Sequence, residues 1–165
     1  MKMPAVKVRK GKCKRRIGRI LDLAGHRGDA FFCASIDGVE VGGIAIASDE
    51  EFDQVRAVEV VPEAQRKGVG TALYTAAAKR ACAAGKLLRS DEDRSDLDEA
   101  FWRKQRQKGR ATAIFQGGAD ESIELEESGV DLDHVNPDNY EKSDYVYSLK
   151  KCGKLDLSGL RRRGR

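Results

Sequence analysis

The chain has 165 residues, of which 40% are hydrophobic, so its length and composition fit one domain with one ordinary core. No apolar run approaches the roughly 20 residues that a membrane-spanning helix needs. The N-terminus also lacks the apolar core of a secretion signal. We therefore expect no membrane contact and a soluble protein of the cytoplasm.

Charge is unevenly distributed, although the net charge is only +4. Basic residues crowd the ranges 7–16 and 161–165, whereas acidic residues dominate 91–98 and 120–144. This pattern predicts basic flexible tails over 1–15 and 153–165 around a single domain over 16–152. Basic tails attract polyanions, which makes nucleic acid a possible partner. The alternative is that the tails only keep the protein in solution.

The cysteines give no sign of a shared site. Cys13, Cys33, Cys82 and Cys152 are widely spaced without a C-x-x-C pair, and the chain has only two histidines. Such spacing favours neither a zinc site nor a disulfide framework. We expect no bound metal and free thiols, with Cys33 and Cys82 in the core.

Hydrophobic periodicity predicts the elements in chain order. Alternating residues predict strands over 17–23 and 29–36, and Asp37-Gly38 predicts a tight turn into a strand over 39–47. A fourth strand over 55–61 precedes a helix over 67–84, which Gly85 ends. A strand over 86–90, a helix capped by Ser95, and strands over 111–115 and 145–149 follow. The range 117–139 is expected to be a flap or insert, and the whole order predicts an α+β domain with a mixed sheet.

The most informative stretch is 58–73, V-E-V-V-P-E-A-Q-R-K-G-V-G-T-A-L. It carries a β-branched strand into a basic turn with two glycines, and a helix follows. Glycines let backbone N–H groups approach an oxyanion closely, and the helix N-terminus adds its dipole and free donors. Thr71 stands where a nucleotide-triphosphate loop needs Lys, and Leu73 where a dinucleotide loop needs a small residue. The stretch therefore predicts an anion-binding turn of another kind.

The pattern Gln/Arg-x-x-Gly-x-Gly/Ala, after a strand ending in V-x-V-x-P, resembles the pyrophosphate loop of the GNAT superfamily of acyl-CoA-dependent N-acetyltransferases. A weaker resemblance continues to residue 84, through 86–90, and over 95–104, where S-x-x-x-x-A-F-W-x-K stands. The resemblance implies a mixed, mainly antiparallel sheet flanked by helices. The two helices that the family places after its first strand have no counterpart among the predicted elements, unless the first strand lies earlier in the chain.

The resemblance also implies which residues bind acetyl-CoA. Backbone at Val60 and Val61 would pair with the pantetheine arm, and Ser95 would contact that arm where the family often has Asn. Backbone N–H groups of the turn would bind the pyrophosphate, with added charge from its cations; the turn residues are Gln65, Arg66, Lys67, Gly68, Val69, Gly70 and Thr71.

Acetyl transfer to an amine also needs a route for protons. A general base would be a carboxylate near the ends of the fourth and fifth strands. Glu59 is the leading candidate because it is the only charge in the apolar run 57–62, and Asp91 and Asp53 come after it. Each of them has a simpler interpretation as a surface residue or an ion-pair partner.

The acid is less determined than the base. By resemblance, Trp102 stands where many family members have a Tyr that protonates the departing thiolate, and an indole N–H cannot usefully give up its proton. Tyr74 and Tyr140 are conceivable substitutes, although packing or surface roles suit them better. Otherwise water, or the unaided thiolate, suffices.

Three functions remain open. The first is an N-acetyltransferase that moves acetyl from acetyl-CoA to a primary amine of a small molecule, protein or modified nucleic acid by direct attack in a ternary complex. The second is a nucleic-acid-associated protein, targeted by its basic tails and by the basic helix over 101–108. The third is a catalytically silent acyl-CoA-binding sensor.

Overall fold

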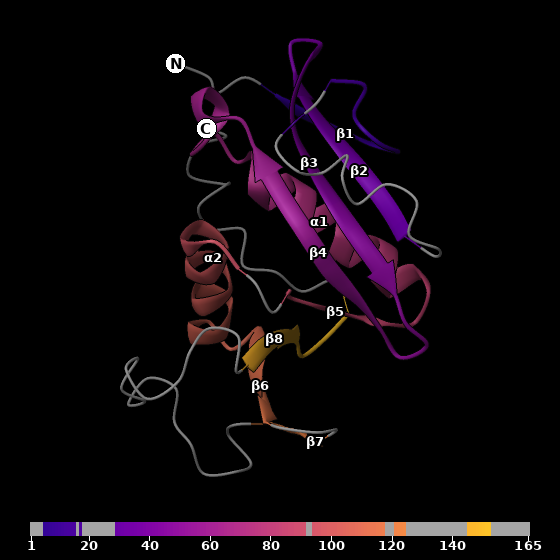
Figure 1. Cartoon of the computed structure of the whole chain (residues 1–165), viewed down its shortest axis with the longest axis vertical. Coiled ribbons are helices and arrows are strands. Elements are labelled where there is room, and N and C mark those ends of the chain that lie inside the picture. Colours follow the sequence, from indigo (N-terminus) through magenta and orange to yellow (C-terminus); the bar gives the residue numbers. More distant parts are fainter. Residues whose placement is uncertain are drawn as a thin grey trace.

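The computed structural model describes residues 5–15, 17, 29–91, 94–117, 121–124 and 145–152. These residues form an eight-stranded sheet in the order β1-β2-β3-β4-β5-β8-β6-β7, together with two α-helices (Figure 1). The elements are β1 (Val6–Lys10), β2 (Asp29–Ile36), β3 (Val39–Ser48), β4 (Phe52–Val60), the 3-10 turn η2 (Pro62–Ala64), α1 (Val69–Ala83), β5 (Leu87–Arg89), α2 (Asp96–Gln107), β6 (Ala111–Gly117), β7 (Glu121–Glu124) and β8 (Tyr145–Leu149).

The sheet is mixed and mainly antiparallel. Strands β1 to β4 form an antiparallel meander, β4 and β5 are parallel, and β5, β8, β6 and β7 pair antiparallel. The predicted α+β fold with a GNAT-like sheet is therefore confirmed. Neither of the helices described here has the length and apolar character to cross a membrane.

The turn between β2 and β3 follows the sequence prediction. Asp37 and Gly38 have φ angles of 51° and 79°, the left-handed pair that a two-residue hairpin of this type requires. Among the other predicted elements that lie in the described residues, β2 and β8 have the predicted bounds, whereas β4 begins earlier, at Phe52, and α1 begins later, at Val69.

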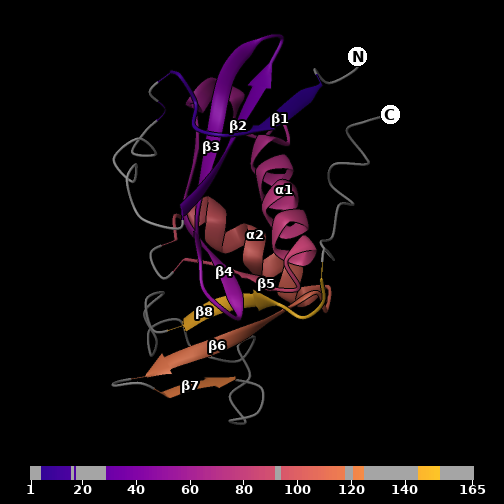
Figure 2. The same ribbon diagram turned by 90° about the vertical axis from the view of Figure 1, so that its right-hand side faces the viewer.

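Helix α1 covers one face of the meander (Figure 2). Its small residues let it lie close to the strands, and at Gly42 of β3 the approach is closest. A Cβ on Gly42 would meet Val69 Cγ1 at 2.8 Å and the Glu59 carbonyl oxygen at 3.0 Å. Gly42 thus allows the first turn of α1 to sit directly against β3 and β4, which positions the turn that precedes the helix.

The first strand lies earlier than the sequence analysis predicts. Part of the expected tail over 1–15 forms β1, which pairs antiparallel with β2. Val6 and Val8 pack against the core while Lys7 and Arg9 are exposed, so the two-residue period is hidden inside a basic run. Apart from Ile17, the strand predicted over 17–23 lies outside the described residues, and so does the tail over 153–165. No helix occurs in the described residues between β1 and β2.

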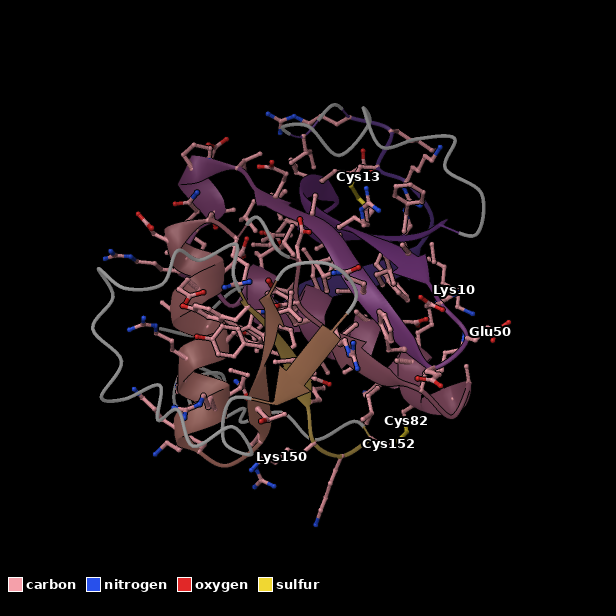
Figure 3. The ribbon with its side chains drawn as sticks, turned by 60° about the horizontal axis from the view of Figure 1, so that its bottom comes forward. Lys10, Cys13, Glu50, Cys82, Lys150 and Cys152 are labelled. Carbon is pink, nitrogen blue, oxygen red and sulfur yellow. A yellow bond between two sulfur atoms is a disulfide. The ribbon has the colours of Figure 1, made fainter. Side chains whose placement is uncertain are left out.

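The prediction of free thiols is wrong. Cys13 is bonded to Cys33, and Cys82 to Cys152 (Figure 3). The first bridge ties the segment after β1 to β2, and the second ties the end of α1 to the residues that follow β8. Residues 20 and 70 positions apart in sequence meet because of the sheet topology, which the spacing of cysteines does not reveal.

Candidate functional site

Strand β4 separates from β5 after the first three of its nine residues. The two strands pair only from Phe52 with Leu87 to Gln54 with Arg89, and β5 ends there. Gln54 bridges the fork, because its side-chain amide donates to the Ser90 carbonyl oxygen at 3.3 Å. Beyond the fork, β4 runs to Val60 with no β5 partner in the described part of the chain. Beyond Gln54 this edge of β4 therefore lacks a strand partner among the described residues, and it ends at the turn before α1.

The turn after β4 is built around two left-handed residues. Val61 and η2 lead to Gln65, and then Arg66 and Gly68 adopt φ angles of 64° and 82°. The left-handed region costs a non-glycine residue roughly 1 kcal/mol or more, so Arg66 marks a conformation that the surrounding structure imposes. The turn aims the chain so that α1 begins directly at the end of the β4 edge.

Helix α1 begins without a cap. Gly68 holds the N-cap position without a side chain, and the first turn of the helix contains no acidic residue. The first helical hydrogen bond runs from the Ala72 N–H to the Gly68 carbonyl oxygen at 3.0 Å, so the N–H groups of Val69, Gly70 and Thr71 lie ahead of it in a turn that no side chain caps. A Cβ on Gly70 would meet nothing within 4 Å, so there is open space beside these donors. The arrangement fits a phosphate-type anion.

The family model described as the acetyltransferase (GNAT) domain matches residues 27–105, the range that contains this turn and both helices almost completely. Over residues 27–105, which is 79 of the 165 residues, the chain is similar to the GNAT family. The resemblance seen in the sequence is thereby confirmed. No curated protein sequence matches the chain significantly.

Solved structures agree with this fold. A putative GNAT acetyltransferase of Desulfovibrio desulfuricans is 15% identical, with a TM-score of 0.54 over 88% of this chain and 98% of its own. A GNAT family acetyltransferase of Elizabethkingia anophelis with acetyl-CoA bound is 12% identical, with a TM-score of 0.52 over 87% of this chain and 95% of its own. A putative acyl-CoA N-acyltransferase of Klebsiella pneumoniae is 18% identical, with a TM-score of 0.51 over 80% and 79%. At these identities the likeness concerns the fold.

The three candidate bases lie in different surroundings. Asp53 is fully buried and accepts from Arg80 Nη1 at 2.6 Å, an ion pair that fastens β4 to α1. Asp91 follows β5 and is half-buried, and its carbonyl oxygen accepts from Arg94 at 2.7 Å. Glu59 is half-buried on the free length of β4, opposite Gly43 of β3.

Glu59 points away from α1. Its neighbours Val58 and Val60 pack against the core under that helix, so alternation along the strand turns the Glu59 side chain to the other face. Gly43, its partner across the strand pair, has no side chain to cover it. No hydrogen-bond partner for the Glu59 carboxylate occurs within the described ranges. Of the three carboxylates, it has the surroundings that suit a base.

The aromatic residues considered as acids are packed together between α1 and α2. Trp102 is fully buried and stacks on Tyr147, and its Nε1 has no hydrogen-bond partner among the residues that the structure describes. Tyr74 stacks on Phe101 with ring centroids 4.2 Å apart and donates to Asp98 Oδ1 at 3.1 Å. Burial, and then the charge of Asp98, raise the pKa of Tyr74 well above its ordinary value, so its phenol holds its proton firmly. Tyr140 lies outside the described residues.

Several groups that were predicted to contact acetyl-CoA already form hydrogen bonds within the protein. The Val60 carbonyl oxygen accepts from the Gln65 side chain at 3.3 Å, and the Val61 N–H donates to the Val41 carbonyl oxygen at 2.9 Å. Ser95 Oγ accepts the Asp98 N–H at 3.2 Å and caps α2, and the Ser95 hydroxyl also interacts with the Asp98 carboxylate. Arg66 and Lys67 are exposed on the turn.

A buried carboxylate hub beside the fork escaped the sequence analysis. Glu99 Oε2 accepts from Arg94 Nε at 2.6 Å, while Oε1 accepts from the hydroxyls of Tyr145 and Tyr147 at 2.7 and 2.9 Å and from Arg103 at 3.2 Å. Burial alone would raise the pKa of Glu99, but the donors outweigh it and lower the pKa below its ordinary value of 4.5. The hub joins α2 to β8 and fixes the segment that leaves β5. An acidic residue in an otherwise typical helix start gives no sequence signal of such a role.

Proposed function

We propose that the protein is an acyl-CoA-dependent N-acetyltransferase that moves acetyl from acetyl-CoA to a primary amine by direct attack in a ternary complex. The observation that carries the proposal is the uncapped start of α1, with N–H groups ahead of the first helical hydrogen bond, no acid in the first turn and open space at Gly70. A pyrophosphate supplies the negative charge that such a helix start lacks. A solved GNAT neighbour that holds acetyl-CoA supports the same ligand.

The unpaired edge of β4 suggests where the acyl group would lie. The edge begins at the fork that Gln54 closes and ends at the glycine turn, so a ligand bound through its pyrophosphate can extend along β4 toward Glu59. Attack by the neutral amine forms the N–C bond, and the C–S bond of the thioester then breaks. The Glu59 carboxylate takes a proton from the amine, and water returns a proton to the thiolate.

A test of the ligand uses the Gly70→Val variant. Wild-type protein should bind acetyl-CoA and CoA in a calorimetric titration, and Gly70→Val should abolish binding because its branched Cβ fills the space of the pyrophosphate. Gly68 is a poorer probe, since valine at a φ of 82° would strain the backbone as well. Normal binding by Gly70→Val, measured on protein with an unchanged thermal midpoint, would refute the site.

A test of the base uses the pH dependence of turnover with an amine found by an acceptor screen. The rate should rise with pH along one ascending limb and show no descending limb near the ordinary tyrosine pKa of about 10, because Trp102 stands in place of the acid. Glu59→Gln should flatten the ascending limb with nearly unchanged affinity for CoA. Full activity of Glu59→Gln would move the assignment to Asp91, since the Arg80 ion pair of Asp53 supports a structural role.

A silent acyl-CoA sensor is the second candidate function. It is favoured because neither aromatic residue near α2 can readily protonate a departing thiolate. The Tyr74 hydroxyl already donates to Asp98, and Trp102 is fully buried in the core. Binding of acetyl-CoA without turnover of any amine in the screen would favour the sensor over the enzyme.

A further inference from the structure

The basic segment at the N-terminus is folded onto the sheet. Strand β1 pairs with β2 from Val6 opposite Ile36 to Lys10 opposite Phe32, and the Gly11 N–H then donates to the Phe31 carbonyl oxygen at 2.7 Å. Two residues later, the disulfide from Cys13 ties the chain to β2. The segment therefore has a fixed course along the edge of the sheet.

One carboxylate organises the turn after β1. Glu40 accepts the Arg15 N–H at 2.6 Å and the Lys14 N–H at 3.0 Å, and it also pairs with Arg9 at 2.9 Å. The two backbone N–H groups lower the pKa of Glu40, so it remains charged. Although the Cys13 and Cys33 sulfurs lie within 4.8 Å of the Glu40 carboxylate, the sulfurs are bonded to each other, and the cluster serves to fasten the turn.

Because Glu40 holds the turn largely through backbone groups, most of the cationic side chains remain exposed. We call these side chains the N-terminal platform; they are Lys7, Arg9, Lys10, Lys12, Lys14 and Arg15, and all are exposed. No acidic residue interrupts the range 6–15. Within the described structure, Arg9 is paired with Glu40 and Lys12 lies 4.9 Å from the centre of the Phe31 ring, whereas Lys7, Lys10 and Lys14 have no carboxylate partner.

Protection of a sheet edge explains only part of this arrangement. Lysines on an edge strand prevent pairing with other chains, which accounts for Lys7 and Lys10. The turn beyond Lys10 offers no strand edge, yet a carboxylate and a disulfide hold it with its cations outward. Ordered cations lose less conformational freedom on binding than those of a flexible tail. The structure thus favours recognition of a polyanion.

We propose that the N-terminal platform binds the phosphate backbone of nucleic acid, an interaction separate from acyl transfer. Residues 7–15 carry six exposed cations, of which Lys7, Lys10 and Lys14 have no carboxylate partner among the described residues. Such cations can contact several phosphates, and binding of this kind is independent of base sequence. The platform lies near the glycine turn, because Val61 packs against the cluster of Cys13, Ile17 and Cys33. The experiment must therefore distinguish nucleic acid from the phosphates of CoA.

The test measures binding of labelled single-stranded RNA, single-stranded DNA and duplex DNA of about 20 nucleotides, longer than a typical single-strand site. The full chain is titrated from about 0.05 to 0.3 M salt, with the triple variant Lys7→Gln, Lys10→Gln, Lys14→Gln beside it. At 0.1 M salt the triple variant should bind at least about 30-fold more weakly, and its log–log salt slope should be shallower by about 2 to 3. Its affinity for acetyl-CoA and its thermal midpoint should not change.

A matched control removes the same charge elsewhere, through Lys79→Gln on α1 and Lys150→Gln and Lys151→Gln after β8. Lys150 lies at the opposite end of the molecule from Cys13 (Figure 3). We expect less than a threefold loss for this control. Binding confined to one of the three polymers supports the proposal provided that the platform variant removes it.

Three results would overturn the proposal. The first is absence of salt-dependent binding by the wild-type chain to all three polymers. The second is an equal loss in both triple variants, or a loss only when residues 153–165 are removed, since either would place binding elsewhere. The third is a platform variant that loses affinity for acetyl-CoA and keeps its affinity for nucleic acid, which would assign these lysines to the phosphates of CoA.

Discussion

The two helices begin in opposite ways. Helix α2 satisfies its own start, because Ser95 accepts the Asp98 N–H and three acids, Asp96, Asp98 and Glu99, occupy the first turn. Helix α1 begins at Gly68 in the left-handed region with no cap and no acid. The lack of an N-cap side chain lowers the stability of a helix by roughly 1 kcal/mol. The chain itself therefore supplies negative charge to the start of α2, whereas the start of α1 lacks it and fits the anionic ligand that we propose.

The largest effect should follow from removing the charge that α2 supplies through Glu99. Glu99→Gln removes the carboxylate that pairs at 2.6 Å with Arg94, whose side chain is only 1% exposed. The free energy of unfolding should fall by about 3 to 4 kcal/mol, measured by denaturant titration. Arg103→Gln removes the exposed partner of the same carboxylate and should cost at most about 0.5 kcal/mol.

The difference in unfolding free energy between wild type and Glu99→Gln should depend on pH. The pKa of Glu99 is lowered in the folded state, so its contribution is complete above the ordinary value of 4.5 and is lost as the pH falls through the lower folded value. Wild type should therefore lose its advantage over Glu99→Gln on acidification below pH 4.5. An advantage that stays constant across this range, or a loss below about 1 kcal/mol at neutral pH, would contradict the hub.

An acidic residue placed in the first turn of α1 should remove the difference in charge between the two helix starts. Thr71→Glu gives α1 the negative charge that α2 already has, which should stabilise the helix by about 0.5 kcal/mol and repel a pyrophosphate. We expect acetyl-CoA to bind about 100-fold more weakly, equivalent to about 2.7 kcal/mol, in a calorimetric titration. Thr71→Gln is the control for size and should bind nearly normally. Equal affinities for the two variants would mean that the first turn of α1 does not face the phosphates.

The sequence predicts α1 and its turn well because their cause is local. Two glycines, a preceding β-branched strand and a run of alanines lie within a few residues of one another, and each restricts the backbone directly. Asp37 and Gly38 fix the β2–β3 turn in the same way, with both φ angles positive. Such features need no information about distant parts of the chain.

The hub and the disulfides could not be predicted because their partners are remote. Glu99 meets Tyr145 and Tyr147 across 46 and 48 residues, and Cys82 meets Cys152 across 70. Only the placement of β8 between β5 and β6 brings these groups together. Strand β1 was missed for another reason, since its two buried valines alternate with cations whose charge suggested a tail.

The smallest effect concerns Ser95, whose side chain caps α2 and is also expected to contact the ligand. Its oxygen caps α2 and its hydroxyl interacts with the Asp98 carboxylate, and we expect the pantetheine arm beside it to accept from the same hydroxyl when acetyl-CoA binds. Ser95→Ala should lower the free energy of unfolding by about 1 kcal/mol and weaken acetyl-CoA binding about fivefold, the values of one cap and one neutral hydrogen bond. Ser95→Asp keeps the acceptor without the hydroxyl donor, so it should restore stability and leave the affinity low, whereas Ser95→Thr should preserve both. Normal affinity in Ser95→Ala would leave this residue as a cap alone and restrict the acetyl-CoA contacts to the β4 edge and the start of α1.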